Sequence, residues 1–221
     1  MIACLFSGGK DSTLAVHTVV DSGKKVELLI TMVADNEFSY MFHKPAIEFT
    51  SLQAEAMGIR QIIGRTKGEK EVELADLERT LVNNDITELI TGAVASTYQK
   101  ERIGALCRKH GIEPVSPLWG INSVDELSEI ATRFNAIITH VSAEGFDESF
   151  LGKRIDAAMI ERLIKLHNKY KINMSFEGGE AESFVLDAPL FKKRIKIIKA
   201  HNAWNGQVGT YVIDEARLEG K

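Results

Sequence analysis

Residues 1–20 read MIACLFSGGKDSTLAVHTVV, and this stretch decides the fold. The apolar run Met1–Phe6 predicts a buried β-strand, and Ser12–Val20 predicts an α-helix with Asp11 or Ser12 at its N-cap. Between them lies a tight loop, SGGKDS, that contains two adjacent glycines. A strand that passes through a glycine loop into a helix typically opens an α/β sheet, and open α/β sheets bind ligands at such strand ends.

The alternation of strand and helix continues through the first two thirds of the chain. We expect further strands at Val26–Ala34, Gln61–Ile63 and Glu88–Thr91, and helices at Pro45–Met57, Lys70–Asn83 and Ser96–His110. Apolar strands separated by helices predict a doubly wound, mostly parallel sheet of the Rossmann-like α/β class, with helices on both faces.

The later chain has a different pattern, so we expect a boundary near residues 117–120. Residues 1–118 then form an N-terminal domain, and residues 119–221 form a smaller α+β portion. Within this portion we expect helices at Val124–Phe134 and Asp156–Tyr170, and strands at Ala136–Val141, Phe184–Leu186, Ile195–Ala200 and Val208–Ile213. Asn205-Gly206 separates the last two strands and predicts a type I′ turn, which makes them an antiparallel hairpin.

Composition narrows the function class. The chain has 221 residues and a formal net charge of −4, which disfavours stable nucleic-acid binding. The two cysteines, Cys4 and Cys107, form neither a CxxC pair nor a zinc motif. We see no signal peptide and no apolar run of membrane-spanning length, so we expect a cytoplasmic protein without a membrane partner.

The SGGKDS loop has the chemistry of a phosphate site. Gly8 and Gly9 let the backbone turn tightly and present its N–H groups to anionic oxygens, and the following helix adds partial positive charge. Ser7 and Ser12 can donate hydroxyl hydrogen bonds, and Lys10 either adds a full charge to the phosphates or lies in solvent. The alternative is an ordinary strand-to-helix turn without a ligand.

Two better-known phosphate loops do not fit this turn. Aligned on the Walker A motif, GxxxxGK[ST], the chain has Cys4 at the first glycine and Asp11 at the Ser/Thr position. The dinucleotide motif GxGxxG is also absent from the turn.

The segment after the fourth predicted strand reads GAVASTYQKER. Gly92 allows close backbone approach, and Ser96 can cap the next helix. Tyr98, Gln99 and Arg102 then lie in or near the first turn, toward the sheet edge, where Arg102 can clamp phosphate or carboxylate oxygens. Without a ligand, the same residues describe a capped helix with a solvated face.

Residues 177–183 read EGGEAES and place three carboxylates, Glu177, Glu180 and Glu182, within seven residues around a glycine turn. Such a group can hold Mg²⁺, bind ammonium, or remove a proton as a general base. Taken alone, the pattern is equally typical of a solvated acidic turn.

The SGGKDS loop resembles the PP-loop of the N-type ATP pyrophosphatase superfamily, which has an adenine nucleotide alpha-hydrolase-like fold. Together with GAVASTYQKER, Pro117-Leu118-Trp119-Gly120 and EGGEAES, it resembles the diphthine–ammonia ligases, or diphthamide synthetases, over nearly the full chain. The last motif usually reads EGGEYET in that family. Ala181 here replaces an aromatic ring, whereas Ser183 keeps a hydroxyl.

The resemblance implies ATP and Mg²⁺ as cofactors. It places the phosphates at the loop and adenine beside the end of the second strand, and Asp11 becomes a Mg²⁺ contact because its charge alone would repel phosphate. The ATP-binding residues expected in this way are Ser7, Gly8, Gly9, Lys10, Asp11, Ser12, Met32, Val33, Gly92, Ser96, Tyr98 and Gln99. The catalytic residues expected are Glu177, Glu180, Glu182 and Arg102.

The implied reaction is amidation of diphthine, a modified histidine on translation elongation factor 2. The diphthine carboxylate attacks ATP to give an acyl-adenylate and pyrophosphate, and ammonia, supplied as ammonium, then displaces AMP. The polar segment 142–154 and the C-terminal hairpin are candidate docking surfaces, and removal of everything after Tyr170 should spare ATP binding. A homo-oligomer is compatible with the sequence. The alternatives are a PP-loop enzyme that modifies tRNA by sulfur transfer or lysine ligation, and a non-catalytic ATP-binding module.

Overall fold

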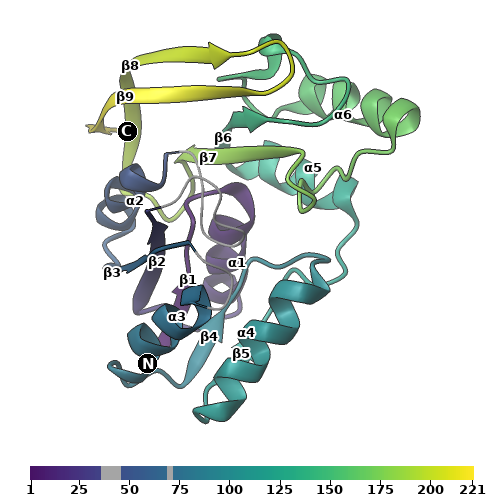
Figure 1. Ribbon diagram of the computed structural model, residues 1–221. Coiled ribbons are helices and arrows are strands. Elements are labelled where there is room, and N and C mark those ends of the chain that lie inside the picture. The colour runs from purple at the N-terminus through teal and green to yellow at the C-terminus, as the bar shows by residue number, and fades with distance from the viewer. Residues whose placement is uncertain (36–45, 69–71) are drawn as a thin grey trace.

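The computed structural model describes residues 1–35, 46–68 and 72–221, and these residues form two sheets (Figure 1). A five-stranded sheet with the order β3-β2-β1-β4-β5 occupies the N-terminal half, and a four-stranded sheet with the order β7-β6-β9-β8 occupies the C-terminal half. The first sheet is parallel throughout and the second is antiparallel. The predicted α/β class with an α+β C-terminal portion is therefore confirmed.

The N-terminal sheet reverses its strand order beside β1, because β2 and β4 both pair with that strand. Its strands are β1 (Ile2–Leu5), β2 (Leu28–Ala34), β3 (Arg60–Thr66), β4 (Glu88–Ile90) and β5 (Glu113–Val115). Its helices are α1 (Lys10–Asp21), α2 (Thr50–Met57), α3 (Val72–Val82) and α4 (Thr97–Lys109), and a 3₁₀ turn, Ile47–Phe49, precedes α2. Buried residues of α1 and α2 pack in one cluster and those of α3 and α4 in another, so both faces are covered as predicted.

Three local predictions for this half need correction or lie outside the described residues. The N-cap of α1 is Gly9, so Asp11 and Ser12 lie inside the first helical turn. Strand β5 was not predicted, because its three residues, Glu-Pro-Val, have no apolar pattern. Pro114 is tolerated there because β5 is an edge strand. Pro45 and Lys70, where two helices were expected to begin, fall outside the described residues.

The C-terminal half follows the predicted order, but its hairpin differs in detail. It comprises α5 (Ser123–Arg133), β6 (Asn135–Val141), a 3₁₀ turn (Glu148–Phe150), α6 (Ala157–Tyr170), β7 (Ala181–Asp187), β8 (Lys193–Trp204) and β9 (Gly209–Gly220). The predicted type I′ turn is wrong, because that type requires positive φ at both central residues and Asn205 does not have it, whereas Gly206 has a φ of 98°. Four residues, 205–208, connect the strands, and Asn205 N–H donates to the Val208 carbonyl at 3.1 Å.

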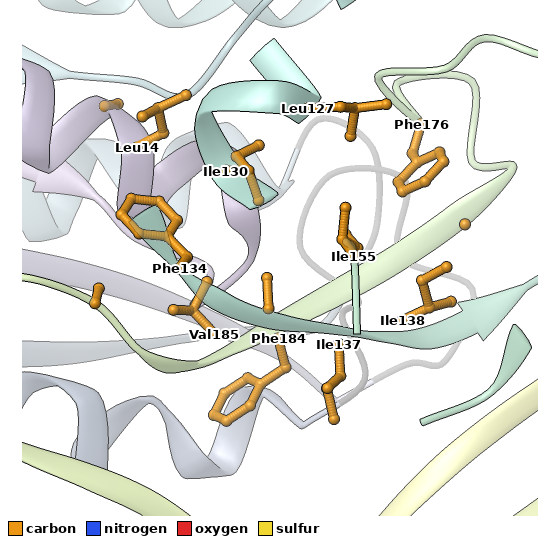
Figure 2. Packing of buried hydrophobic residues seen from close by; sticks show 14 of the residues in the cluster. Leu14, Leu127, Ile130, Phe134, Ile137, Ile138, Ile155, Phe176, Phe184 and Val185 are labelled. Atoms are coloured by element: carbon orange, nitrogen blue, oxygen red, sulfur yellow. The ribbon is translucent and has the colours of Figure 1, made fainter. Parts of the chain in front are cut away.

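One buried apolar cluster spans both halves of the molecule. Leu14 of α1 belongs to the same cluster as Phe134 at the end of α5, Ile138 of β6 and Phe184 of β7 (Figure 2). Burial of this continuous apolar surface stabilises the two halves against each other. The division into two domains at residues 118/119 stays a prediction. The buried cluster contains residues from both sides of that position.

Candidate active site

A cavity of about 530 Å³ lies at the C-terminal edge of the parallel sheet, between the end of β1 and the segment 175–183, which comprises the turn before β7 and the first residues of that strand. This volume lies in the range of small-molecule sites. Ten of the predicted site residues line it: Ser7, Lys10, Asp11, Ser12, Met32, Gly92, Ser96, Gln99, Glu177 and Glu182. Six do not: Gly8, Gly9, Val33, Tyr98, Arg102 and Glu180.

Gly8 shapes the loop from behind the cavity wall. Its φ is 78°, and a Cβ at this position would lie 2.4 Å from Gln53 Oε1. The Gln53 amide donates to the carbonyls of Gly8, at 2.9 Å, and Val185, at 2.8 Å. Val185 N–H in turn donates to the Gly8 carbonyl at 3.1 Å. Strand β7 of the C-terminal half therefore fixes the course of the loop.

A second cross-contact caps helix α1. Gly9 has no side chain to accept the first N–H groups of the helix. Ser183 of β7 does so instead, because its Oγ accepts a hydrogen bond from Lys10 N–H at 3.1 Å. Inside the loop, the Ser7 and Ser12 hydroxyls lie 3.2 Å apart at the cavity wall.

The predicted close backbone approach at Gly92 is confirmed, and the approaching backbone is the start of α1. A Cβ on Gly92 would lie 2.7 Å from Ser12 N and 2.8 Å from Asp11 C. Ser96 is the N-cap of α4, as predicted, and its Oγ accepts from Gln99 N–H at 3.5 Å. Gly92 thus lets β4 and α1 meet closely enough to form one wall.

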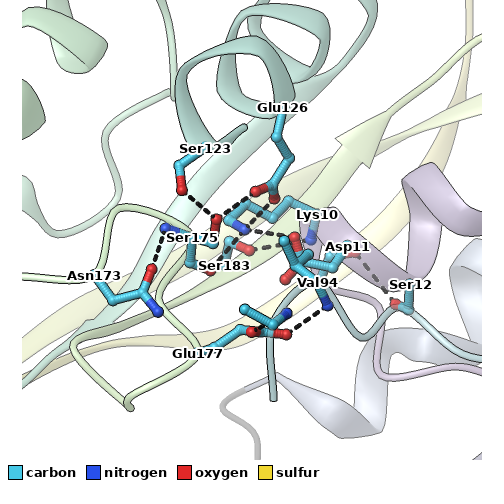
Figure 3. Close-up of polar contacts among 12 residues, drawn as sticks. Lys10, Asp11, Ser12, Val94, Ser123, Glu126, Asn173, Ser175, Glu177 and Ser183 are labelled. Carbon is cyan, nitrogen blue, oxygen red and sulfur yellow. Dashed lines mark hydrogen bonds and ion pairs between the residues drawn. The ribbon is translucent and has the colours of Figure 1, made fainter. Parts of the chain in front are cut away.

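The Lys10 side chain is buried, and its ammonium group contacts protein oxygens and not solvent. The residue is 1% exposed, and its Nζ contacts Asp11 Oδ1 at 2.5 Å, Glu126 Oε1 at 2.7 Å and the Ser175 carbonyl at 2.9 Å (Figure 3). The expectation of a solvated lysine is wrong, because these three oxygens replace water. A role of Lys10 in binding ATP stays a prediction.

Burial and charge act against each other in this cluster. Burial raises the pKa of Asp11 well above its usual value, and the Lys10 charge only partly opposes this effect. Burial also acts to raise the pKa of Glu126, but the charge of Lys10 and hydrogen bonds from Asp11, Lys10 and Ser175 hold that pKa below its usual value. The two carboxylates keep the pKa of Lys10 above its ordinary value despite burial. The cluster therefore holds a lysine cation against an ionised Glu126.

The three carboxylates of the EGGEAES turn do not form one group. Glu177 reaches across to the N-terminal half, where its two oxygens accept the backbone N–H groups of Val94, at 2.6 Å, and Ala95, at 2.5 Å. Glu180 folds back on its own turn and accepts N–H groups of Asn173 and Gly178 at 3.0 and 2.9 Å. Among the described residues, no three His, Cys, Asp or Glu side chains gather in a way that could hold a metal ion.

Arg102 and Tyr98 interact with each other on α4. Arg102 Nη1 donates to the Tyr98 hydroxyl at 2.9 Å, and the guanidinium carbon lies 5.0 Å from the ring centroid. Neither residue lines the cavity, and Val33 does not line it either. Their assignments as phosphate clamp and nucleotide contacts stay predictions.

Sequence reasoning missed Glu126, Ser175 and the positioning role of Ser183. Glu126 carried a readable signal: it lies four residues before Ile130 and one before Leu127, on the buried face of α5, where a carboxylate needs a partner. Ser175 had no such signal, because it contributes a backbone carbonyl from a turn.

Fold and cavity together define a class of protein. It is a doubly wound α/β protein with a glycine-containing loop at the switch point of its parallel sheet, and an α+β portion that lines the same cavity. The family model described as Diphthamide synthase N-terminal domain matches residues 1–114, and that of the Diphthamide synthase C-terminal domain matches residues 121–218. The chain belongs to the diphthamide synthase family.

Curated relatives support the same family. A human protein named diphthine–ammonia ligase is 33% identical, with 88% of this chain and 81% of the relative covered. A relative of the same name from Schizosaccharomyces pombe is 33% identical over 86% of this chain but 35% of its own length. A solved structure titled as a predicted subunit of a tRNA methyltransferase from Methanocaldococcus jannaschii has 16% identity and a TM-score of 0.48, covering 85% of this chain and 97% of that chain.

Proposed function

We propose that this protein is a diphthine–ammonia ligase. It uses ATP to join ammonia to the carboxylate of diphthine on translation elongation factor 2, and it releases AMP and pyrophosphate. The observation that carries the proposal is the two-part cavity, in which a phosphate loop from one half faces a carboxylate-bearing turn from the other. Membership of the diphthamide synthase family supports it.

The chemistry explains why ATP is needed. A carboxylate is a poor acyl donor, because its leaving group would be oxide. Attack of a carboxylate oxygen on the α-phosphorus breaks the bond to the β-phosphate and gives an acyl-adenylate plus pyrophosphate. Ammonia then attacks the acyl carbon and AMP leaves, so a single cavity must accommodate the triphosphate and the acceptor.

The loop supplies the electrostatic stabilisation. The Ser7 and Ser12 hydroxyls and the N-terminus of α1 line the cavity as a preorganised set of donors for the departing pyrophosphate, and Gly8 and Gly9 shape the turn that places them. The Lys10 N–H does not belong to this set, because Ser183 already accepts its hydrogen bond. Met32 lines the cavity at the end of β2, where adenine is expected to lie.

Glu182 is the proposed general base for ammonium. It lies in β7 and lines the cavity, whereas Glu180 does not. Ammonium must lose a proton before its nitrogen can attack, and a carboxylate in the cavity can take that proton.

Asp11 is the proposed protein contact for Mg²⁺. Its side chain is 30% exposed at the cavity wall, and Mg²⁺ commonly takes one or two protein carboxylates, with phosphate oxygens and water completing its shell. The ion would supply charge neutralisation at the phosphates.

The acceptor protein needs a docking surface. The long β8–β9 hairpin and the segment 142–154 remain the proposed surfaces, and we further propose a cytoplasmic location. Among residues 1–35, 46–68 and 72–221, no helix is both long and apolar enough to cross a bilayer. Stable nucleic-acid binding is not part of the proposal, and a homo-oligomer is compatible with it.

Sulfur transfer to tRNA is the weaker alternative. Cys4 and Cys107 are both fully buried, at 0% exposure. Burial raises the pKa of the Cys4 thiol, and it raises that of Cys107 to about 11. A nucleophilic sulfur must be a thiolate, so neither residue suits that chemistry.

The test is amidation of diphthine-bearing elongation factor 2 with ATP and ammonium. We expect AMP and pyrophosphate in equal amounts with the amide, and Glu182→Gln should lose amidation while retaining ATP binding. Release of ADP, or ATP binding without turnover under any acceptor condition, would contradict the proposal. The expectation that truncation after Tyr170 spares ATP binding is withdrawn, because Ser183 and Val185 of β7 hold the loop.

A further inference from the structure

Lys10 and Glu126 form a fully buried ion pair between the two halves of the molecule. Lys10 opens helix α1, directly after the phosphate loop, and Glu126 lies on α5 of the C-terminal half. The two side chains are 1% and 0% exposed, and their charged atoms lie 2.7 Å apart. Removing two charges from water is expensive, so such a pair needs good geometry and further hydrogen bonds.

Those further bonds are present. Lys10 Nζ has three donors, and three oxygens accept them: Asp11 Oδ1, Glu126 Oε1 and the Ser175 carbonyl. The second oxygen of Glu126 accepts the Ser175 hydroxyl at 2.6 Å (Figure 3). Two of the three acceptors, Glu126 and Ser175, belong to the C-terminal half, so groups outside the loop help to determine the orientation of the lysine head.

This orientation has a consequence for Asp11. Its carboxyl lies at the cavity wall, 2.5 Å from the Lys10 ammonium. If the ammonium moved away, the Asp11 side chain would be free to turn into the cavity, where the phosphates of a nucleotide are expected to lie. The contact with the ammonium therefore keeps the carboxyl at the wall.

We propose that Lys10 and Glu126 are a positioning pair for the nucleotide: Glu126 anchors the Lys10 ammonium, which holds the Asp11 carboxyl at the cavity wall so that the triphosphate can approach. Neither residue needs to touch a phosphate oxygen. The inference rests on the proposed function, since it deepens the assignment of the loop as the ATP site.

The double variant Lys10→Met/Glu126→Leu tests this role. It removes both charges together and keeps the volume similar, and apolar replacement of a buried pair often leaves stability intact. ATP binding is measured by calorimetry in EDTA, so that no metal contributes. We expect the Kd for ATP to rise at least tenfold, and adding Asp11→Ala, which removes the unanchored carboxyl, should recover most of that loss. With Mg²⁺ and acceptor, the KM for ATP should rise more than kcat falls.

The matched control is Glu129→Leu, which removes the i,i+4 partner of Arg133 from the same helix, leaves the Arg133–Asp21 ion pair in place, and should leave the Kd unchanged. If the double variant does not fold, Lys10→Gln/Glu126→Gln replaces it, with the same expectation. An unchanged Kd in the folded variant, or a loss that Asp11→Ala does not recover, overturns the inference. AMP release by the wild type is measured separately. ATP binding without AMP release would contradict the proposed function, whereas the positioning role of Lys10 and Glu126 would still be tested by the Kd values.

Discussion

Glu126 and Glu177 both connect the halves of this molecule, and they differ in burial. Glu126 is fully buried against the Lys10 cation, whereas Glu177 is half-buried and accepts two backbone N–H groups at the cavity wall. Water cannot replace Lys10 at the first contact, but it can hydrate the partners of the second. The first contact should therefore determine whether the halves stay together, and the second how the cavity wall is held.

The largest expected effect separates these two contacts by stability. Glu126→Leu leaves the Lys10 cation buried beside Asp11 and Ser175, and breaking a buried pair in this way typically costs about 3–5 kcal/mol. Urea unfolding should show this loss, and adding Lys10→Met should recover much of it. Equal stability of Glu126→Leu and the wild type would remove the basis of the comparison.

Gly92→Ala should have the next largest effect, because it pushes the segment after β4 away from the start of α1. Glu177 binds the first of these elements and the Lys10–Glu126 pair the second. The new Cβ would lie 2.7 Å from the backbone nitrogen of Ser12, and backbone cannot move aside as a side chain can. Overpacking of this kind typically costs about 1–3 kcal/mol, and ATP binding should weaken as α1 shifts. Gly220→Ala is the control, since no atom lies within 4 Å of its Cβ position and its φ is not positive.

Glu177→Gln should have a smaller effect on stability and a clear effect on the site. A neutral amide retains one acceptor for Val94 and Ala95 and loses the charge, which we expect to destabilise the fold by about 1 kcal/mol at this half-buried position. Amidation kcat/KM should fall while the Kd for ATP stays within a few-fold. A stability loss as large as that of Glu126→Leu would contradict the distinction drawn between the two contacts.

His17 provides the smallest test, through pH. The imidazole is fully buried on α1; Nδ1 lies 2.8 Å from the Thr13 carbonyl and Nε2 accepts Leu190 N–H at 3.2 Å, an arrangement that requires the neutral ring. Burial lowers the pKa of His17 below 6.5, so the unfolded chain binds the proton more tightly. The stability that the neutral His17 ring contributes to the folded state is therefore fully present above about pH 6.5, and it is lost as the pH falls through the lowered pKa.

The measurement is the free energy of unfolding across that range in wild type and His17→Leu. The wild type should lose stability relative to the variant as the solution is acidified below pH 6.5. Parallel profiles would show that His17 does not titrate on unfolding.

Local features could be predicted from the sequence, and contacts between distant segments could not. The SGGKDS loop and the Ser96 cap depend on neighbouring residues, so their positions were predictable. Lys10 was misjudged because its partner Glu126 is 116 residues away. The spread of the EGGEAES carboxylates was missed because turns at Gly178 and Gly179 direct neighbouring side chains to different backbone partners.

The central claim is that this cavity activates a carboxylate at the α-phosphorus of ATP. The most direct test is to label the diphthine carboxylate with ¹⁸O and to analyse the nucleotide product by mass spectrometry. The account predicts AMP that carries one ¹⁸O atom, transferred from the acceptor when ammonia displaces the adenylate. Amide formation with unlabelled AMP, or with the label in inorganic phosphate alongside ADP, would contradict it.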